Sequence, residues 1–367
     1  MMLEIVFCSL SLTLVLTGIA KFALFLALIS VLILFHEFGH FVFAKSAGVT
    51  VTDFALGFGP TLLSTRRGDT TYRINALPLG GYCKMVGEDQ ADDGSADPGN
   101  FQRKSWGARF AIIVAGPIFN LILAALIFTF IGAVLGIQTG VINVVKNVIP
   151  GTPAASAGLQ PGDQIVELDG RPVRSGNDMY DYIHGNKGKV IAVDVARGSR
   201  IIHLHILAKP TDEGGTVVGA FGFQAEDAIE HKPFVDAVVW GVSMVGVTAV
   251  GQTVAIGEAI AHHDSSALHG PVGIARIVTG TVQYGLRWIL TLTATLSVVL
   301  GVVNLFPFPA LDGGRLAFLV VELARGRPVD PEKEGLAHLA GFALLMVFVV
   351  FVTYHDIVQW VQGKGGL

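Results

Sequence analysis

Four long runs of apolar residues alternate with polar segments along the chain. They cover residues 22–44, 110–135, 288–306 and 336–354. A helix of about 20 apolar residues is long enough to cross the hydrocarbon core of a bilayer. The pattern therefore predicts a polytopic α-helical membrane protein with about four transmembrane helices.

The segment between the second and third runs has a different pattern. From residue 137 onward, charged residues and Gly-containing turns mix with alternating strand patterns such as "VIAVDVA" and "IIHLHIL", which are typical of half-buried strands. Residues 150–173, "PGTPAASAGLQPGDQIVELDGRPV", resemble a PDZ domain of the kind found in bacterial proteases. We therefore expect an inserted PDZ-like α/β domain over residues 137–225, a class of domain that captures peptides by strand addition.

Composition agrees with a membrane protein and excludes several functions. The chain of 367 residues is 51% hydrophobic and 15% charged, against the roughly 25% charged residues of an average soluble domain. Its net charge is −4 and it has no basic block, so we expect no nucleic-acid partner. Only Cys8 and Cys83 are cysteines, so a metal site would have to use histidine and carboxylate ligands.

The first apolar run contains "HEFGH", residues 36–40. Ionisable groups are costly inside a membrane and are functional hypotheses by default. His36 and His40 share one helix face, as the two histidines of an HExxH zinc site do, and Glu37 is placed to act as the general base. A catalytic zinc needs a third protein ligand and one open position.

Asp312 is the best candidate for the third ligand. It lies in "NLFPFPALDGGR", residues 304–315, where the third apolar run ends. Pro307 and Pro309 break the helix there, and irregular backbone at membrane depth is tolerated only where protein or a wet cavity surrounds it. Its distance along the third run matches that of His36 along the first, so both motifs are expected at the same depth toward the cytoplasmic face.

Two further apolar segments are ambiguous. Residues 233–260 carry little charge, but an additional crossing would invert the later motif relative to the first, so we expect the segment 226–282 to lie on or dip into the membrane surface. Residues 2–20 lack the positively charged start of a secretory signal and are followed by Lys21. We interpret residues 1–20 as an N-terminal extension.

A strand close to the first run is a candidate for binding substrate. Residues 70–77, "TTYRINAL", follow the "GFGP" turn at 57–60 and read as a strand that could pair with an unwound substrate. The residues proposed to contact substrate in this strand are Thr71, Tyr72, Arg73, Ile74 and Asn75.

These motifs together resemble the site-two protease family of intramembrane zinc metalloproteases. The resemblance is carried by HEFGH in the first span, "NLFPFPALDGG" at the third, "PLGGYCKM" at 78–85 and the PDZ-like insertion. It implies Zn²⁺ held by His36, His40 and Asp312, with Glu37 as catalytic base. It further implies that Asn304, in the NxxPxP motif with Pro307 and Pro309, contacts the substrate or its oxyanion, and that a membrane-associated β-hairpin precedes the second span. Well-known members carry two PDZ domains, whereas this chain has room for one.

The resemblance also implies a substrate class. The expected function is cleavage of single-span membrane proteins or peptides within or near their transmembrane segment, after trimming outside the membrane, as with an anti-sigma factor or remnant signal peptides. The alternative is a non-catalytic receptor or zinc-binding scaffold with a peptide-binding PDZ domain. Glu37 discriminates between them, because a structural zinc site closes with four protein ligands. A zinc transporter is a weaker alternative, since the spans lack further His or Asp along a route across the membrane.

Lys and Arg between the first two runs and after the third predict that these loops face the cytoplasm. We expect an integral protein of the bacterial inner membrane, surrounded by the lipid bilayer, with its active site toward the cytoplasm and the PDZ-like domain, with a possible peptide ligand, outside. The expected segments are the extension (1–20), the first half of the membrane core (21–136), the PDZ-like domain (137–225), the membrane-surface segment (226–282) and the second half of the core (283–367).

Overall fold

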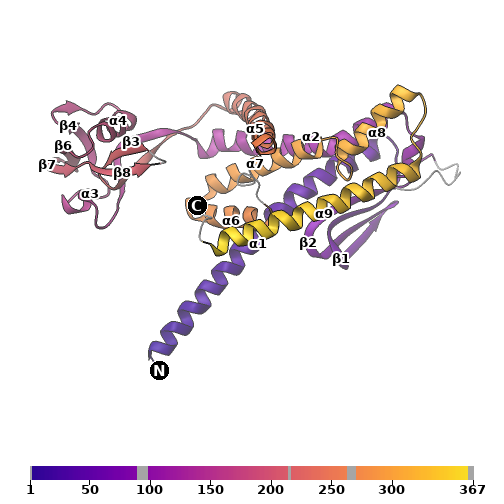
Figure 1. Cartoon of the computed structure of the whole chain (residues 1–367), viewed down its shortest axis with the longest axis horizontal. Helices are drawn as coiled ribbons and strands as arrows, with labels where there is room; N and C mark the ends of the chain where they lie inside the picture. Colours follow the sequence, from indigo (N-terminus) through magenta and orange to yellow (C-terminus); the bar gives the residue numbers. More distant parts are fainter. Residues whose placement is uncertain (1, 89–97, 214–215, 263–269, 363–367) are drawn as a thin grey trace. The chain divides into compact units, whose positions relative to one another are not determined.

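The computed structural model describes residues 2–88, 98–213, 216–262 and 270–362 (Figure 1). Each of the five expected segments has a part outside the described residues, namely 1, 89–97, 214–215, 263–269 and 363–367. The chain divides into two compact units. The first consists of Met1–Ile131 together with Phe234–Leu367, and the second of Gly132–Pro233.

The first unit is built from long apolar helices. Among the described residues, five helices are long and apolar enough to cross a membrane, over Gly18–Ser46, Trp106–Leu135, Phe234–Ala259, Leu286–Asn304 and Glu332–Val361. The length and apolar composition of these helices identify the protein as an integral membrane protein. The helices of this unit are α1 (Met2–Ser46), α2 (Trp106–Phe130), α5 (Phe234–His262), α6 (Pro271–Thr281), α7 (Leu286–Asn304), α8 (Asp312–Arg325) and α9 (Pro331–Val361), with short turns η1 (Phe101–Arg103), η2 (Ile131–Leu135), which leads into the second unit, and η3 (Val282–Tyr284).

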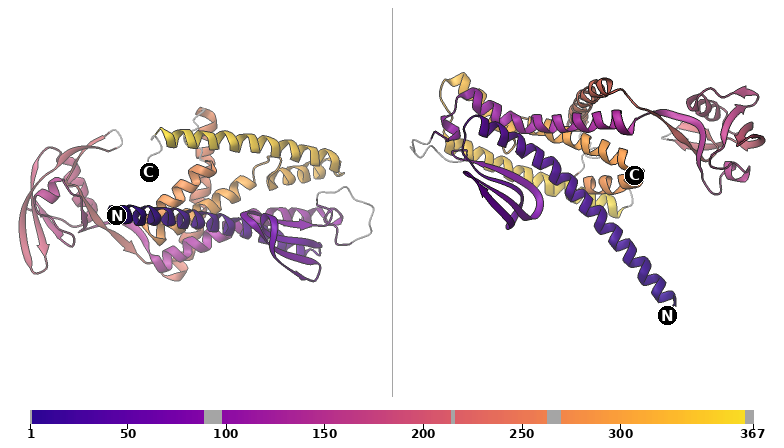
Figure 2. Two further views of the ribbon diagram at one scale, coloured as in Figure 1. Left: turned by 90° about the horizontal axis from the view of Figure 1, so that it is seen from below. Right: turned by 180° about the vertical axis from the view of Figure 1, so that it is seen from behind.

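The structure changes the interpretation of two segments. The expected extension is continuous with the first span, since α1 is a single helix of 45 residues. The segment around 233–260, expected at the membrane surface, forms the 29-residue helix α5, which qualifies as a span by length and composition. A count of four spans is thus not confirmed. Within this unit α5 runs across the direction of α2 and α9 (Figure 2, left).

Helix α2 is the centre of the first unit and packs against α1, α5, α7 and α8. It begins after Ser105, whose side chain accepts a hydrogen bond from the backbone N–H of Ala108 and so caps the helix. Close contact with α1 is possible because Gly39 has no side chain: a Cβ there would lie 2.4 Å from the backbone oxygen of Ala115. Small residues at such contacts let helices in membranes approach closely.

A bent sheet lies beside the C-terminal half of α1 (Figures 1 and 2). It consists of β1 (Val51–Arg67) and β2 (Thr70–Met85). Residues 51–56 of β1 pair with both halves of β2, and residues 61–67 pair with 70–75. The order of the strand segments across the sheet is therefore 61–67, 70–75, 51–56 and 81–85. In this order, residues 81–85 form an outer edge.

The second unit is a small α/β domain. Its main sheet has the order β10, β3, β4, β6 and β7, with β5 beside β4, and β8 pairs with β9. The side chains of Ile165, Ile191 and Ile206 are fully buried in its core. The elements are β3 (Ile137–Val148), α3 (Pro153–Ser156), β4 (Gln164–Leu168), β5 (Arg171–Pro172), α4 (Gly176–Gly185), β6 (Val190–Arg197), β7 (Arg200–Leu207), β8 (Lys209–Glu213), β9 (Thr216–Ala220) and β10 (Phe223–Glu230).

Candidate metal centre

Two imidazoles converge on one face of α1. His36 and His40 are separated by one helical turn, both are buried, and their Nε2 atoms lie 3.2 Å apart. Helix geometry alone brings side chains four residues apart onto the same face. The expected pairing of the two histidines is therefore present in the fold.

Asp312 is brought to the histidines by the turn that precedes α8. The two residues that follow Asp312 must be glycine. A Cβ on Gly313 would lie 2.1 Å from the oxygen of Phe306, and one on Gly314 would lie 2.5 Å from the oxygen of Phe308. The turn therefore packs directly on the start of α8. Its first residue, Asp312, places Oδ2 3.0 Å from Nε2 of His36 and 3.5 Å from Nε2 of His40.

Hydrogen bonds behind the rings set which ring nitrogen carries the proton. Nδ1 of His40 donates to the backbone oxygen of Ile112 at 2.9 Å, which leaves the lone pair of Nε2 facing Asp312. Nδ1 of His36 lies 3.1 Å from the side-chain amide of Asn120. Asn120 Oδ1 is buried and has no hydrogen-bond partner within the part of the chain that the structure describes. Turning this amide by half a turn lets Oδ1 accept from Nδ1–H of His36, and the two histidines then share the same tautomer.

This arrangement fits a zinc ion. The atoms of His36, His40 and Asp312 that could ligate a metal all lie within 4.8 Å of one another. Asp312 Oδ2 is buried and, apart from the two imidazoles, has no hydrogen-bond partner among the described residues. Three electron-rich atoms repel each other unless a cation lies among them. Two imidazole nitrogens and a carboxylate oxygen are ligands that zinc accepts, and they leave a fourth position open.

Glu37 lies beside this cluster at the wall of a cavity of about 400 Å³. The cavity is lined by residues of α1, the outer strand 81–85 of β2, and the start of α8. Gly81 of that strand is the close neighbour of the glutamate, since a Cβ there would lie 3.3 Å from Cγ of Glu37. The Glu37 carboxylate, the three candidate metal ligands and a strand edge thus share one cavity.

The strand expected to bind substrate is not the one at this cavity. Residues 71–74 are paired on both sides, with 53–56 and with 63–66, and Asn75 donates its side-chain amide to the backbone oxygen of Gly57 at 2.9 Å. A strand with partners on both edges cannot accept a further strand. The residues Thr71, Tyr72, Arg73, Ile74 and Asn75 therefore form the inside of the sheet, and residues 81–85 offer the open edge.

The structure places the NxxPxP residues around the centre rather than in it. Asn304 ends α7, and Pro307 and Pro309 lie in the turn before α8; all three are described, and none lines the cavity. Sequence reasoning missed Gly116 and Asn120 of α2 as neighbours of the histidines. The signal that could have found Asn120 was its polar amide in the middle of an apolar run.

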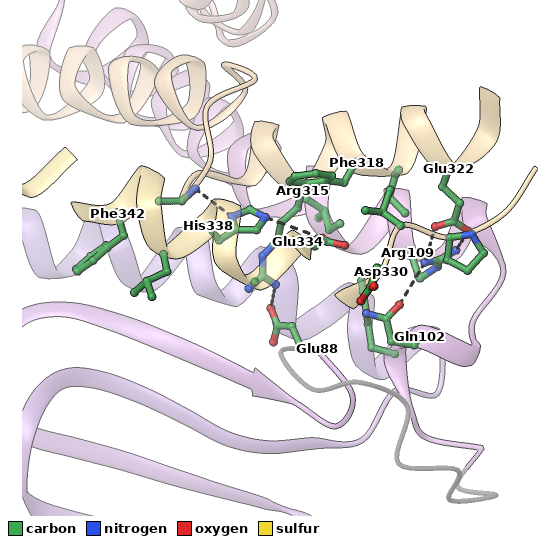
Figure 3. A pocket seen from close by; sticks show the side chains of 18 residues that line it. Glu88, Gln102, Arg109, Arg315, Phe318, Glu322, Asp330, Glu334, His338 and Phe342 are labelled. Carbon is green, nitrogen blue, oxygen red and sulfur yellow. Dashed lines mark hydrogen bonds and ion pairs between the residues drawn. The ribbon is translucent and has the colours of Figure 1, made fainter. Parts of the chain in front are cut away.

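A larger cavity of about 900 Å³ adjoins the first (Figure 3). Glu88, Ile113, Ala310 and Arg315 line both cavities. Its far end holds a buried ion pair between Arg109 of α2 and Glu322 of α8. Trp106 of α2 also donates its indole N–H to the backbone oxygen of Leu319 at 2.8 Å, so α2 and α8 are held together by polar contacts.

A zinc-type ligand set with an adjacent carboxylate, set among apolar helices, defines a membrane-embedded metallohydrolase. The chain belongs to Peptidase family M50, whose sequence model matches residues 24–348. It is a zinc-dependent membrane metalloprotease, and the family expected from its motifs is confirmed.

Relatives of similar length carry matching names. A Brucella suis protein named as a zinc metalloprotease is 33% identical over 91% of this chain and 94% of its own. The regulator of sigma-W protease RasP of Bacillus subtilis is 29% identical over 91% of this chain and 97% of its own.

The PDZ domain of an SdrC-like protein from Listeria monocytogenes is similar over 24% of this chain and 90% of its own, with 30% identity and a TM-score of 0.21.

Proposed function

We propose that His36, His40 and Asp312 hold the catalytic zinc and that Glu37 is the general base. The observation that carries this assignment is the buried Oδ2 of Asp312, which faces the two Nε2 atoms and has no other polar partner among the described residues. In such a site zinc would act as a Lewis acid that polarises the scissile carbonyl and lowers the pKa of the attacking water. Glu37, on the wall of the same cavity, takes the proton from the attacking water and returns it to the leaving amine.

We further propose that the substrate binds as an added strand along residues 81–85. A peptide bond inside a helix is shielded by the helix's own hydrogen bonds, so a substrate must unwind before its carbonyl can be attacked. An open strand edge offers the unwound backbone new partners. Support comes from the register of the sheet, which leaves this edge unpaired among the described strands, and from its position on the wall of the cavity.

The substrate class follows from the setting of the cavity. We infer that the substrates are single-span membrane proteins cut within or near their membrane segment, after trimming outside the membrane. The name of the Bacillus subtilis relative, a regulator of a sigma factor, supports an anti-sigma factor as one such substrate. We place the protein in the bacterial inner membrane with four spans, the active site toward the cytoplasm and the inserted domain outside. The direction of α5 across the other helices supports a helix lying along the membrane surface.

The decisive experiment compares the wild type with Glu37→Gln on a tagged single-span reporter that lacks a large external domain. The general base contributes about 10²–10⁴-fold to such reactions, so Glu37→Gln should lose cleavage by this factor while zinc content stays at one ion per chain. Glu258→Gln, an exposed carboxylate on α5, is the matched control. Equal cleavage by wild type and Glu37→Gln would remove Glu37 from the mechanism.

The inserted domain is proposed to restrict access to shortened substrates. It is a separate unit inserted between α2 and α5. We propose that it lies on the side of the membrane where the trimmed end of the substrate would lie. Deleting residues 137–225 should let full-length reporter be cut at a rate close to that of the trimmed reporter. If the deletion variant still cuts the trimmed reporter but full-length reporter stays resistant, the domain is not a size filter.

A further inference from the structure

The outer edge of β2 ends in an unusual way. Residues 81–85 pair with β1 on one side, and Val86 donates its N–H to the oxygen of Thr50 on that same side. Because the backbone polar groups of a strand alternate between its two edges, Gly81, Cys83 and Met85 direct theirs to the open edge. These three residues are the positions at which an added strand would form hydrogen bonds.

Glu88 forms hydrogen bonds with the outward-facing backbone groups of Met85, the last of these three residues. Its backbone N–H donates to the oxygen of Met85 at 3.4 Å, and its side-chain Oε2 accepts the N–H of Met85 at 3.3 Å. Both outward-facing polar groups of Met85 are therefore satisfied within the chain. An added strand finds partners at Gly81 and Cys83 and meets the Glu88 carboxylate at the next position.

Glu88 is also anchored to the helix that carries Asp312. Arg315, one turn after Asp312 on α8, forms an ion pair with Oε1 of Glu88 (Figure 3). The side chain of Glu88 is 14% exposed and that of Arg315 is 30% exposed. A half-buried guanidinium–carboxylate pair is held more firmly than one in free solvent. The end of the strand edge is thus fixed relative to the zinc ligands.

We propose that Glu88, held by Arg315, is a register stop for the substrate strand. Because side chains and hydrogen bonds of a strand repeat every two residues, a strand on an open edge can slide in steps of two. Each step would bring a different peptide bond to the metal centre. Because Glu88 occupies the outward-facing hydrogen-bonding groups of Met85, pairing ends at Cys83. The unwound substrate therefore leaves the edge at one fixed point, and one register is selected. Glu88 is a positioning residue, and the inference rests on the strand addition proposed above.

The test maps the cleaved bond by mass spectrometry of both reporter products. The wild type should cut at one main bond. In Glu88→Ala, a second product cut two residues away should rise about tenfold, as expected for losing one hydrogen bond to a charged group. Glu88→Gln keeps an oxygen for the Met85 N–H but loses the ion pair, so its shift should be smaller. Glu258→Gln, an exposed carboxylate on α5, is the control and should keep the wild-type bond.

A slower Glu88→Ala that still cuts only at the wild-type bond would overturn the proposal, because a merely structural role changes rate without changing register. Register can also be read without activity. In the Glu37→Gln background, a photoreactive phenylalanine analogue at Tyr82, on the cavity wall, labels the substrate residue beside it. Labelling of an additional residue two positions away in Glu88→Ala supports the stop, and unchanged labelling refutes it. Absence of labelling with Glu88 intact would refute strand addition itself, and the register stop with it.

Discussion

Gly116 of α2 lies directly against His40 of α1. A Cβ added at Gly116 would come within 2.3 Å of Nε2 of His40 and 2.9 Å of Cε1 of His36. The backbone of α2 therefore forms the floor on which both imidazoles rest. This contact depends on the same close approach of α1 and α2 that Gly39 permits against Ala115.

Gly116→Ala should abolish zinc binding. The new methyl group would occupy the space beside Nε2 of His40, and its three nearest atoms belong to the buried rings of His36 and His40, which would have to shift. We expect zinc content to fall at least about tenfold, and cleavage with it. Zinc is measured on the purified protein by elemental analysis.

The matched control is Gly107→Ala on the same helix, where an added Cβ has no neighbour within 4 Å. It should keep full zinc content. If Gly116→Ala also retained zinc and activity, the metal could not be held at Nε2 of His40.

Asn120→Ala should weaken zinc binding without removing it. Its amide holds Nδ1 of His36, and partners of this kind orient the ring and fix its tautomer. Losing such a partner costs about 10–100-fold in metal affinity. The affinity is measured by competition with a chelator. Ser297→Ala serves as control, because its hydroxyl donates to the backbone oxygen of Asn120 and does not touch His36; an equal loss in both variants would point to a general loosening of α2 against α7.

Gly81→Ala should separate catalysis from metal binding. Its Cβ would lie 3.3 Å from Cγ of Glu37 and 2.9 Å from the oxygen of Ala55, so either the carboxylate or the strand must move. A misplaced base loses part of its 10²–10⁴-fold contribution, and we expect kcat to fall about tenfold. Zinc content should stay at the wild-type level. Loss of zinc together with activity would show that the strand supports the ligands rather than the base.

The sequence predicted that His36, His40 and Asp312 lie together, and it could do so because the geometry of these residues is local. Helix periodicity alone places His36 beside His40, and the helix-breaking residues Pro307 and Pro309 predict the turn before Asp312. The neighbours of the two histidines on α2, Gly116 and Asn120, could not be identified from the sequence. The rotation of α2 about its own axis decides which residues face α1, and this rotation is set by packing in three dimensions. Polar side chains within apolar runs are nevertheless the signal to pursue.

The strand at 71–75 shows where sequence reasoning stops. An alternating pattern predicts a strand, but it does not reveal whether its edges are paired. Here Gly57, at φ +82°, lies where β1 turns away from its first segment, and a Cβ there would lie 2.4 Å from the oxygen of Leu77. The bend lets residues 61–67 cover the far side of 70–75. The edge therefore falls to 81–85, which the sequence marks only by "PLGGYCKM".

Acid should destabilise the inserted domain through Asp163. Burial by itself would raise the pKa of this carboxyl, but it accepts hydrogen bonds from Arg197 at 2.7 and 2.8 Å and from the N–H of Gln160 at 2.8 Å, and together these lower its pKa below the usual value. A group with a lowered pKa stabilises the folded state above its unfolded pKa, about 3.9 for Asp, and this contribution is lost as pH falls through the folded value.

Asp163→Asn should therefore reduce the free energy of unfolding of the domain by about 2 kcal/mol at pH 7, the scale of hydrogen bonds to a charged group, and should flatten the loss of stability below about pH 4. The measurement is amide hydrogen exchange of β4 and β6 in the whole chain, corrected for the intrinsic exchange rate at each pH. Glu226→Gln, an exposed carboxylate on β10, should leave the profile unchanged. If Asp163→Asn and wild type lose protection in parallel as the pH falls, Asp163 does not govern the acid stability of this domain, and the Arg197 contact contributes only packing.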